Sequence, residues 1–359
     1  MLDRLPPELL RHIFDFAAPL HYSPQRYIER RATLRGLSLV SQYFREIAQP
    51  MLPEVFRADP TSFPLLQRGE IGGAIKLLFV SVLQPAALAT ALSLCSAVVE
   101  FRVYLCTLRV DKLAFLPDLR RLSLSQSTLY LPAGITPPTL PLLDQLSLSD
   151  TAVDPDNLYH LLNRQYLPSL RAVGLEAVKR RTDDESLFRI DEEFGRQLEI
   201  VALDLETRRQ SDPSLASAPS LALLTDSVGQ LEPEEAAPIR HLSLRYHRDY
   251  AELKSASSTT LRQDVAFFVK QIVRQCFGQK MSSLRHLDLP DFLSPARNLL
   301  SARLADIRHE YILEPSRAKG VELSWTPYRD PDDEAAESVV PLALWRAMRR
   351  EGESQSVLR

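Results

Sequence analysis

A short apolar pattern recurs along most of the chain: an apolar residue, two variable residues, a second apolar residue, one variable residue and a third apolar residue. Copies begin at positions 75, 98, 119, 143, 170 and 198, and further copies begin at 239, 284 and 318. The last two apolar positions alternate with a variable one, which predicts a short β-strand with one buried face. Helix or irregular coil would return the chain to the next strand, and stacking of the units would bury one continuous core.

A small polar residue follows three of these strands. Cys106, Ser127 and Thr151 occupy this position, and an aliphatic residue comes two positions after each. A small polar side chain can satisfy backbone groups at a tight turn. The pattern and its period of about 20 to 29 residues are those of leucine-rich repeats. We therefore predict an α/β fold for residues 70–325, an irregular solenoid with parallel strands on its concave face and helices or coil on its convex face. A conventional α/β sheet with leucine-rich strands is the alternative.

Three segments interrupt or follow the predicted repeats. Residues 182–193 are acidic, and residues 207–238 are rich in Ser, Ala, Pro and acids, so both are predicted to be loops. Residues 264–277 carry apolar side chains at helical spacing and predict a helix on the convex side. Residues 326–359 are predicted to be an acidic connector and a C-terminal tail, whose apolar residues either cover the last repeat or bind a partner.

Helical periodicity replaces this pattern over the first 57 residues. Proline and Glu8 suit the start of a helix, because proline lacks only a donor that would be unpaired there and the carboxylate complements the helix dipole. Pro19 would end this helix, a second is predicted from Thr33 to Pro50, and a short third element covers residues 51–56. Three short helices bury little core alone, so they predict a module that packs against a neighbour.

The same residues resemble the F-box. The motif residues are Leu5-Pro6-Pro7-Glu8-Leu9-Leu10, Ile13-Phe14, Leu37-Ser38-Leu39-Val40-Ser41, Tyr43-Phe44-Arg45 and Ile47-Ala48. These residue classes follow the order of the family pattern. The connection over residues 19–32 is longer than usual in the family, and we expect it to loop outward. The predicted repeats also resemble the irregular repeats found in many F-box proteins.

This resemblance implies a partner and a function. A three-helix F-box over residues 1–57 would bind a Skp-family adaptor, which connects it to a cullin and a RING subunit. The chain would then be the substrate-recognition subunit of an SCF-type ubiquitin ligase, and its solenoid would bind a protein target. An adaptor-bound structural protein with no role in ubiquitination is the alternative. The family positions that would contact the adaptor, or else hold the three helices together, are Leu5, Pro6, Leu9, Leu10, Ile13, Leu37, Val40 and Phe44.

The concave strand face is the expected surface for a target, because repeat proteins commonly bind there. Residues that alternate with the buried strand positions would point outward on this face. Arginine and tyrosine are enriched at binding hot spots. The sequence therefore predicts target contacts at Arg102, Tyr104 and Arg121.

Composition and motifs favour a binding protein over an enzyme. The net charge of −3 gives no general attraction to nucleic acid or anionic lipid. The three cysteines have neither CxxC nor paired spacing, which indicates no zinc site or disulfide framework and fits a reducing compartment. No signal peptide is recognised, so the cytoplasm, the nucleus or both are expected. We find no GxSxG, HExxH or phosphate-binding loop, and we predict a non-catalytic subunit without a cofactor.

Two further features have alternative interpretations. Residues 77–99 carry no charge and are long enough to cross a bilayer, so a membrane-anchored protein is a minor alternative to a buried strand and helix. His241 and His247 are six positions apart, which matches no usual metal-binding spacing. We expect them to be surface histidines near the end of a strand.

Overall fold

The structure is a computed structural model of the whole chain. It describes residues 5–18, 24–181, 188–189, 192–198, 200–204, 207, 221–225, 239–244, 263, 265–290, 293–294 and 306–326. The chain forms two compact units. The N-terminal unit contains residues 1–170 and 178–194, and the C-terminal unit contains residues 171–177 and 195–332. The fold is mixed α/β, and the strand pairs described in both units are parallel.

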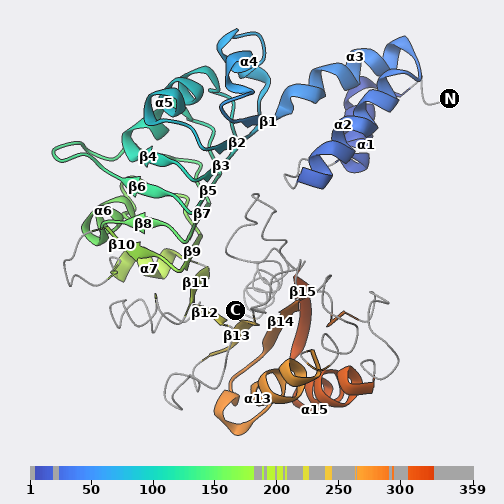
Figure 1. Ribbon diagram of the computed structural model, residues 1–359, viewed down its shortest axis with the longest axis vertical. Coiled ribbons are helices and arrows are strands. Elements are labelled where there is room, and N and C mark those ends of the chain that lie inside the picture. Colours follow the sequence, from blue (N-terminus) through green and yellow to red (C-terminus); the bar gives the residue numbers. More distant parts are fainter. Residues whose placement is uncertain are drawn as a thin grey trace. The chain divides into compact units, whose positions relative to one another are not determined.

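Three helices open the N-terminal unit (Figure 1). They are α1 (Pro7–Ala17), α2 (Pro24–Ser38) and α3 (Gln42–Met51), followed by the 3-10 turn η2 (Leu52–Glu54). Their shared core contains Leu10, Phe14, Leu34, Phe44, Ala48 and Met51, all buried. The rings of Phe14 and Phe44 meet edge to face with centroids 5.3 Å apart, which fixes α1 against α3.

The predicted course of the second helix was wrong. Thr33 lies inside α2, which already begins at Pro24, so much of the expected loop over residues 19–32 is helical. The chain breaks at Leu39 and Val40, and Ser41 caps a separate helix by accepting a hydrogen bond from the Phe44 amide at 3.2 Å. Residues 51–56, predicted as a third element, contain the end of α3, the turn η2 and the first residues of a strand.

Five parallel strands follow the helices, in the order β1-β2-β3-β5-β7. They are β1 (Val55–Ala58), β2 (Leu77–Ser81), β3 (Glu100–Tyr104), β5 (Arg121–Ser125) and β7 (Gln145–Ser149). The repeated apolar positions are in register, since Leu78 pairs with Phe101, and Leu122 pairs with Leu146. The strands predicted from the repeated pattern are confirmed here, whereas β1 was not predicted.

A second, smaller sheet runs beside the first. Its strands are β4 (Thr107–Arg109), β6 (Thr128–Tyr130), β8 (Ala152–Val153) and β10 (Lys179–Arg180), in the order β10-β8-β6-β4. Helices α5 (Pro85–Leu94) and α6 (Pro155–Leu161) lie on the same side as these short strands (Figure 1). Shorter helical segments in this unit are α4 (Phe63–Gln67), η3 (Gly72–Ala74) and η4 (Val110–Phe115). In this unit, each of β3, β5 and β7 is followed by one of the short strands β4, β6 and β8.

The C-terminal unit contains the parallel strands β9 (Ala172–Glu176), β11 (Ile200–Asp204), β12 (Leu221–Thr225), β13 (His241–Leu244), β14 (His286–Pro290) and β15 (Glu322–Thr326). Its helical segments are η6 (Phe268–Val273), α13 (Arg274–Cys276), η7 (Gln279–Met281), η9 (His309–Leu313) and α15 (Glu314–Lys319), while α7 (Glu192–Gln197) spans the boundary in sequence. Apolar side chains of η6 and η9 pack with those of β13 and β14 in one core cluster.

Two predictions about this region have different outcomes. The helix predicted over residues 264–277 is confirmed, although its middle turn is π-helical. The loop predicted over residues 207–238 was wrong at Leu221–Thr225, which form β12 between β11 and β13. Most of residues 182–193 and nearly all of residues 326–359 lie outside the described residues.

Residues 77–99 form β2, the helix α5 and the turn that leads to β3. Throughout the described ranges, no helix is both long enough and apolar enough to span a bilayer.

Candidate docking surfaces

The helical module separates the predicted adaptor-contact residues into three groups. Leu10 and Phe44 are buried between the helices, and Leu5 and Leu37 are half-buried beside the same core. The exposed group is Pro6, Leu9, Ile13 and Val40. Leu9 is 51%, Ile13 45% and Val40 64% exposed, which are high fractions for large aliphatic side chains. The structure therefore assigns the core and the surface roles that the sequence left undivided.

Helical geometry explains this division. Leu10 and Phe14 are four residues apart and face the core, whereas Leu9 and Ile13 occupy the neighbouring stripe. Phe16 continues this stripe seven residues after Leu9 and is 90% exposed. Phe16 was not among the predicted contact residues, although its spacing of seven residues from Leu9 places it on the same side of the helix.

The break between α2 and α3 adds a second apolar corner. Leu39 is 77% exposed and precedes Val40 at the break. The Tyr43 hydroxyl donates a hydrogen bond to the Leu5 carbonyl oxygen at 2.7 Å, which ties the start of α3 to the residue before Pro6. This contact holds the corner close to the beginning of α1. Leu39 was missed because the sequence predicted one uninterrupted helix here.

A buried ion cluster attaches the helices to the first strand. Glu54 ends η2 directly before β1, and its carboxylate pairs with Arg30 of α2 at 2.7 Å and with Arg11 of α1. Arg30 also donates to the Ala18 carbonyl oxygen. Burial raises the pKa of the Glu54 carboxyl, and the two guanidinium groups oppose this shift. Because Arg30 and Glu54 are each 3% exposed, water cannot stabilise their charges, and each charge is compensated by the opposite charge of its partner.

The predicted target-contact residues differ in accessibility. Arg102 is 9% exposed, and its guanidinium pairs with the Glu100 carboxylate at 2.6 Å. Arg121 pairs with the same carboxylate at 3.2 Å, and its side chain is 52% exposed. Tyr104 is half-buried beside the cluster of Val55, Leu77 and Phe79. Only Arg121 of the three thus has a largely accessible side chain.

The expected alternation of outward and buried positions holds for only part of the sheet. Strand β5 alternates, with Leu122 and Leu124 buried between more exposed residues. In β2 every residue is buried, and in β3 only Tyr104 is not. The alternation predicted for β3 was wrong because an ion pair allows the charged side chains of Glu100 and Arg102 to be buried.

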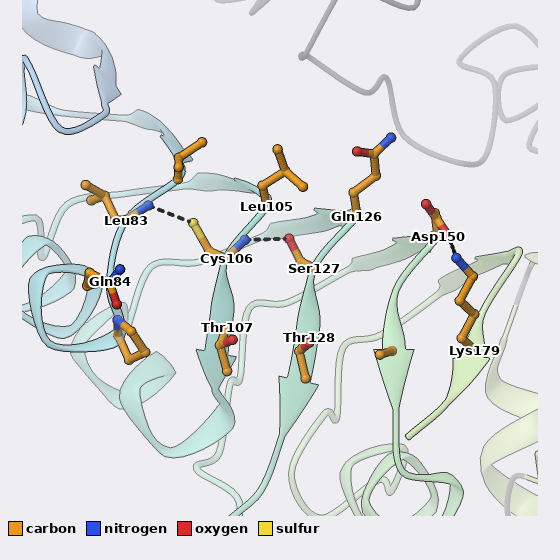
Figure 2. Close-up of a pocket in the computed structure, with 13 residues that line it drawn as sticks. Leu83, Gln84, Leu105, Cys106, Thr107, Gln126, Ser127, Thr128, Asp150 and Lys179 are labelled. Atoms are coloured by element: carbon orange, nitrogen blue, oxygen red, sulfur yellow. Dashed lines mark hydrogen bonds and ion pairs between the residues drawn. The ribbon is translucent and has the colours of Figure 1, made fainter. Parts of the chain in front are cut away.

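Hydrogen-bonded turns connect β3, β5 and β7 to the short strands β4, β6 and β8 (Figure 2). The Cys106 sulfur accepts from the Leu83 amide at 3.3 Å, and the Ser127 hydroxyl accepts from the Cys106 amide at 3.2 Å. The Thr151 hydroxyl donates to the Ser149 carbonyl oxygen at 3.0 Å. These bonds agree with the predicted role of the small polar position.

The residue that directly follows each of the strands β2, β3, β5 and β7 has a left-handed backbone. Its φ is +54° at Val82, +50° at Leu105 and +47° at both Gln126 and Asp150. A hollow of about 600 Å³ lies along these turns. Leu105, Gln126 and Asp150 project from the same edge, and the Asp150 carboxylate meets the Lys179 ammonium at 2.5 Å (Figure 2). We call the row Val82, Leu105, Gln126 and Asp150, together with Lys179, the turn edge.

A buried polar network joins β13, β14 and β15. The Asp288 carboxylate accepts from the Ser243 hydroxyl at 2.8 Å and from the Ser324 hydroxyl at 2.6 Å. His286 Nε2 lies 2.8 Å from the Ser324 oxygen. His241, predicted to be a surface residue, is 5% exposed, and its ring lies 6.3 Å from that of His286. His247 lies outside the described residues.

The hydrogen-bond directions distinguish this network from a nucleophilic serine site. The Ser324 hydroxyl has a single proton, which it donates to the Asp288 carboxylate. The Ser324 oxygen must then accept a hydrogen bond from Nε2–H of His286. His286 therefore does not act as the base that would activate Ser324. The arrangement is that of a polar core which cross-links three strands.

The remaining candidate chemistry within the described residues is limited. No group of three His, Cys, Asp or Glu side chains in this part of the chain could hold a metal ion. Cys95, Cys106 and Cys276 are free and buried, and burial raises the pKa of Cys95 to about 12. Burial also raises the pKa of Cys106 and Cys276, so none of the three thiols has the low pKa of a reactive cysteine.

No protein-family model matches this chain, and a search of curated proteins finds no similar sequence. The surfaces described above therefore rest on residues and geometry alone.

Proposed function

We propose that this chain is the substrate-recognition subunit of an SCF-type ubiquitin ligase. Residues 1–57 form an F-box that binds a Skp-family adaptor, and residues 70–325 form a leucine-rich-repeat-like solenoid that binds a protein target. The chain performs no bond chemistry itself. It raises the effective concentration of the target beside the conjugating machinery that the adaptor recruits.

The observation that carries this proposal is the exposed apolar surface of the helical module. Leu9, Ile13 and Phe16 form one exposed stripe of α1, and Leu39 and Val40 form the corner beside its start. Exposed apolar patches of this kind commonly mark protein–protein interfaces, because burying them in a complex is favourable. Their positions within the F-box-like motif support a Skp-family adaptor as the partner.

The proposal assigns adaptor contacts to those F-box-like positions whose side chains are exposed. Pro6, Leu9, Ile13 and Val40 are the direct contacts, and Leu39 and Phe16 extend the same surface. Leu10 and Phe44 support it from within the helical core, where both are buried. Truncating these core residues would unfold the module and reveal little about binding.

The test is a double substitution of exposed anchors, Leu9→Ala with Ile13→Ala. Binding to a purified Skp-family adaptor is measured by titration calorimetry. We expect at least a tenfold loss of affinity, since truncating a central anchor typically costs about 2 kcal/mol or more. The far-UV spectrum and thermal midpoint should stay close to those of the wild type, because both side chains are already about half exposed.

A matched control uses Phe115→Ala with Leu142→Ala. These side chains are 42% and 40% exposed but lie outside the helical module, so adaptor affinity should not change. If the folded Leu9/Ile13 variant binds the adaptor as tightly as the wild type, the proposed F-box is wrong. Normal adaptor binding without target turnover in cells would instead favour a structural, adaptor-bound protein.

A further inference from the structure

Two apolar residues of the turn edge are both strained and exposed. Val82 and Leu105 have φ values of +54° and +50°, a region that residues other than glycine and asparagine rarely adopt, and least of all a β-branched one. Val82 is nevertheless 54% exposed and Leu105 47% exposed. Neither the strained backbone of these two residues nor the exposure of their apolar side chains stabilises the fold. Asparagine would satisfy the same turn with less strain and without exposing apolar surface.

The surroundings of these residues form a path across the repeats. Neighbouring parallel strands are about 4.8 Å apart, so the row from Val82 to Asp150 extends over about 14 Å. An extended peptide of about four or five residues has the same length. The hollow beside this row is lined by Gln84, Thr107 and Thr128 as well as by the row itself, and these polar groups can bind a peptide backbone.

Charge distinguishes the two ends of the path. The Val82 and Leu105 end is apolar, whereas Lys179 lies at the other end, where its side chain is 68% exposed and that of its partner Asp150 is 38% exposed. The ammonium is thus the more accessible member of the pair. A ligand that fits both ends carries apolar side chains followed by an acidic one.

We propose that the turn edge binds an extended peptide segment of a protein target, with apolar side chains over Val82 and Leu105 and an acidic side chain at Lys179. The identification of this peptide with a ubiquitination target rests on the proposed function, but peptide binding itself does not. The proposal adds a second contact surface to the chain, at the turns rather than on the strand face that contains Arg121.

The test variant is Val82→Asn with Leu105→Asn. Asparagine tolerates the left-handed conformation, so the variant should unfold at the same temperature as the wild type or at a higher one. The probe is a display library of random octapeptides selected on the full chain. We expect the enriched peptides to carry two apolar residues followed by Asp or Glu, and to bind the double variant at least tenfold more weakly. Lys179→Gln should remove the preference for the acidic residue.

Two controls give each outcome a distinct meaning. Ala177→Asn introduces the same residue at a left-handed position outside the turn edge, where φ is +50°, and keeps both apolar side chains, so it should bind selected peptides normally. The Leu9→Ala with Ile13→Ala variant should also bind them normally while losing the adaptor, so failure of the proposed function leaves this result unaffected. The inference is overturned if no peptide is enriched, or if enriched peptides bind the asparagine variant with unchanged affinity.

Discussion

Single side chains at the turns satisfy backbone groups that would otherwise be buried without partners. The Ser127 hydroxyl accepts from the Cys106 amide and donates to the Ser125 carbonyl oxygen at 2.7 Å. Ser127 is 5% exposed, so water cannot replace both bonds easily. A turn in one repeating unit is thereby bonded to the turn in the next. The small polar residues identified in the sequence are structural for this reason.

This role predicts the effect of Ser127→Ala. Loss of the hydroxyl leaves the Cys106 amide without this acceptor, which should lower the free energy of unfolding by about 1–3 kcal/mol. Urea unfolding followed by circular dichroism measures the change. Ser125→Ala, which removes a half-buried hydroxyl two residues earlier but keeps the backbone carbonyl, should cost less. If both variants lost the same free energy of unfolding, the hydrogen bond between the Cys106 amide and the Ser127 hydroxyl would not contribute the expected stability.

Asp59 predicts a pH dependence. Burial alone would raise the pKa of this carboxyl, but hydrogen bonds from the hydroxyls and amides of Thr61 and Ser62 lower it to about 2. A depressed pKa in the folded state means that the carboxylate contributes stability above its unfolded pKa of about 3.9, and this contribution is lost as the pH falls through about 2.

We therefore expect Asp59→Asn to be less stable than the wild type at neutral pH. The difference should shrink between about pH 4 and pH 2, because protonation removes the same interaction from the wild type. Urea midpoints of both proteins across this range measure the convergence. Asp118→Asn, at an exposed site outside this cluster, serves as the control. A difference that stays constant with pH would contradict the assigned hydrogen bonds.

At the scale of elements, the spacing of apolar residues correctly predicted most of the long strands. It did not predict elements whose buried contacts include polar groups. The strands from β2 to β7 match the repeated pattern, because their core positions are regularly spaced Leu, Val and Phe. Helix α2 was misplaced because its sequence is rich in charge, and one of its buried contacts is the ion pair of Arg30 with Glu54. A buried arginine looks like a surface residue in a single sequence.

The same limit explains the missed surface residues. The sequence identified the F-box-like positions as a set, yet only the three-dimensional packing separates Leu9 from Leu10 and Val40 from Phe44. Phe16 could have been found from its spacing on α1, whereas Leu39 required knowledge that the helix breaks. The turn edge could not be predicted either. Glycine or asparagine would have indicated a left-handed residue in the sequence, but valine and leucine occupy these positions at Val82 and Leu105.

The ion cluster gives a prediction for the helical element. Glu54→Gln keeps the shape of the side chain but removes the negative charge that Arg11 and Arg30 share, so the buried Arg30 loses the carboxylate of this ion pair. We expect a loss of about 3 kcal/mol in the free energy of unfolding, typical of a broken buried pair. Asp111→Asn, which breaks the more exposed pair with Arg109, should cost at most about 1 kcal/mol. Similar losses in the two variants would contradict the structural role of the buried cluster.

At the scale of the whole molecule, the two proposed surfaces lie on different elements. The adaptor surface is formed by α1 and the break before α3, and the turn edge is formed by the residues that follow β2, β3, β5 and β7 together with Lys179 of β10. A receptor that acts by tethering needs both surfaces on one chain, because its effect is to hold the target near the conjugating enzyme. Loss of either surface should therefore abolish ubiquitination for different reasons.

This requirement can be tested with a reporter protein fused to a peptide selected on the turn edge. In a reconstituted reaction with adaptor, cullin and RING subunits, the wild-type chain should support ubiquitination of the reporter. The Leu9→Ala with Ile13→Ala variant should fail because it does not join the ligase, and the Val82→Asn with Leu105→Asn variant should fail because it does not hold the reporter.

Mixing the two variants provides the decisive comparison. Each variant retains the surface that the other lacks. Because no single chain in the mixture binds both the adaptor and the reporter, the reporter is not held near the conjugating enzyme, and the mixture should remain inactive. Adding wild-type chain to the mixture should restore the reaction, which shows that neither variant poisons the ligase. Activity of the mixture without wild-type chain would mean that the two surfaces act on different molecules, and the proposed tethering by a single chain would be wrong.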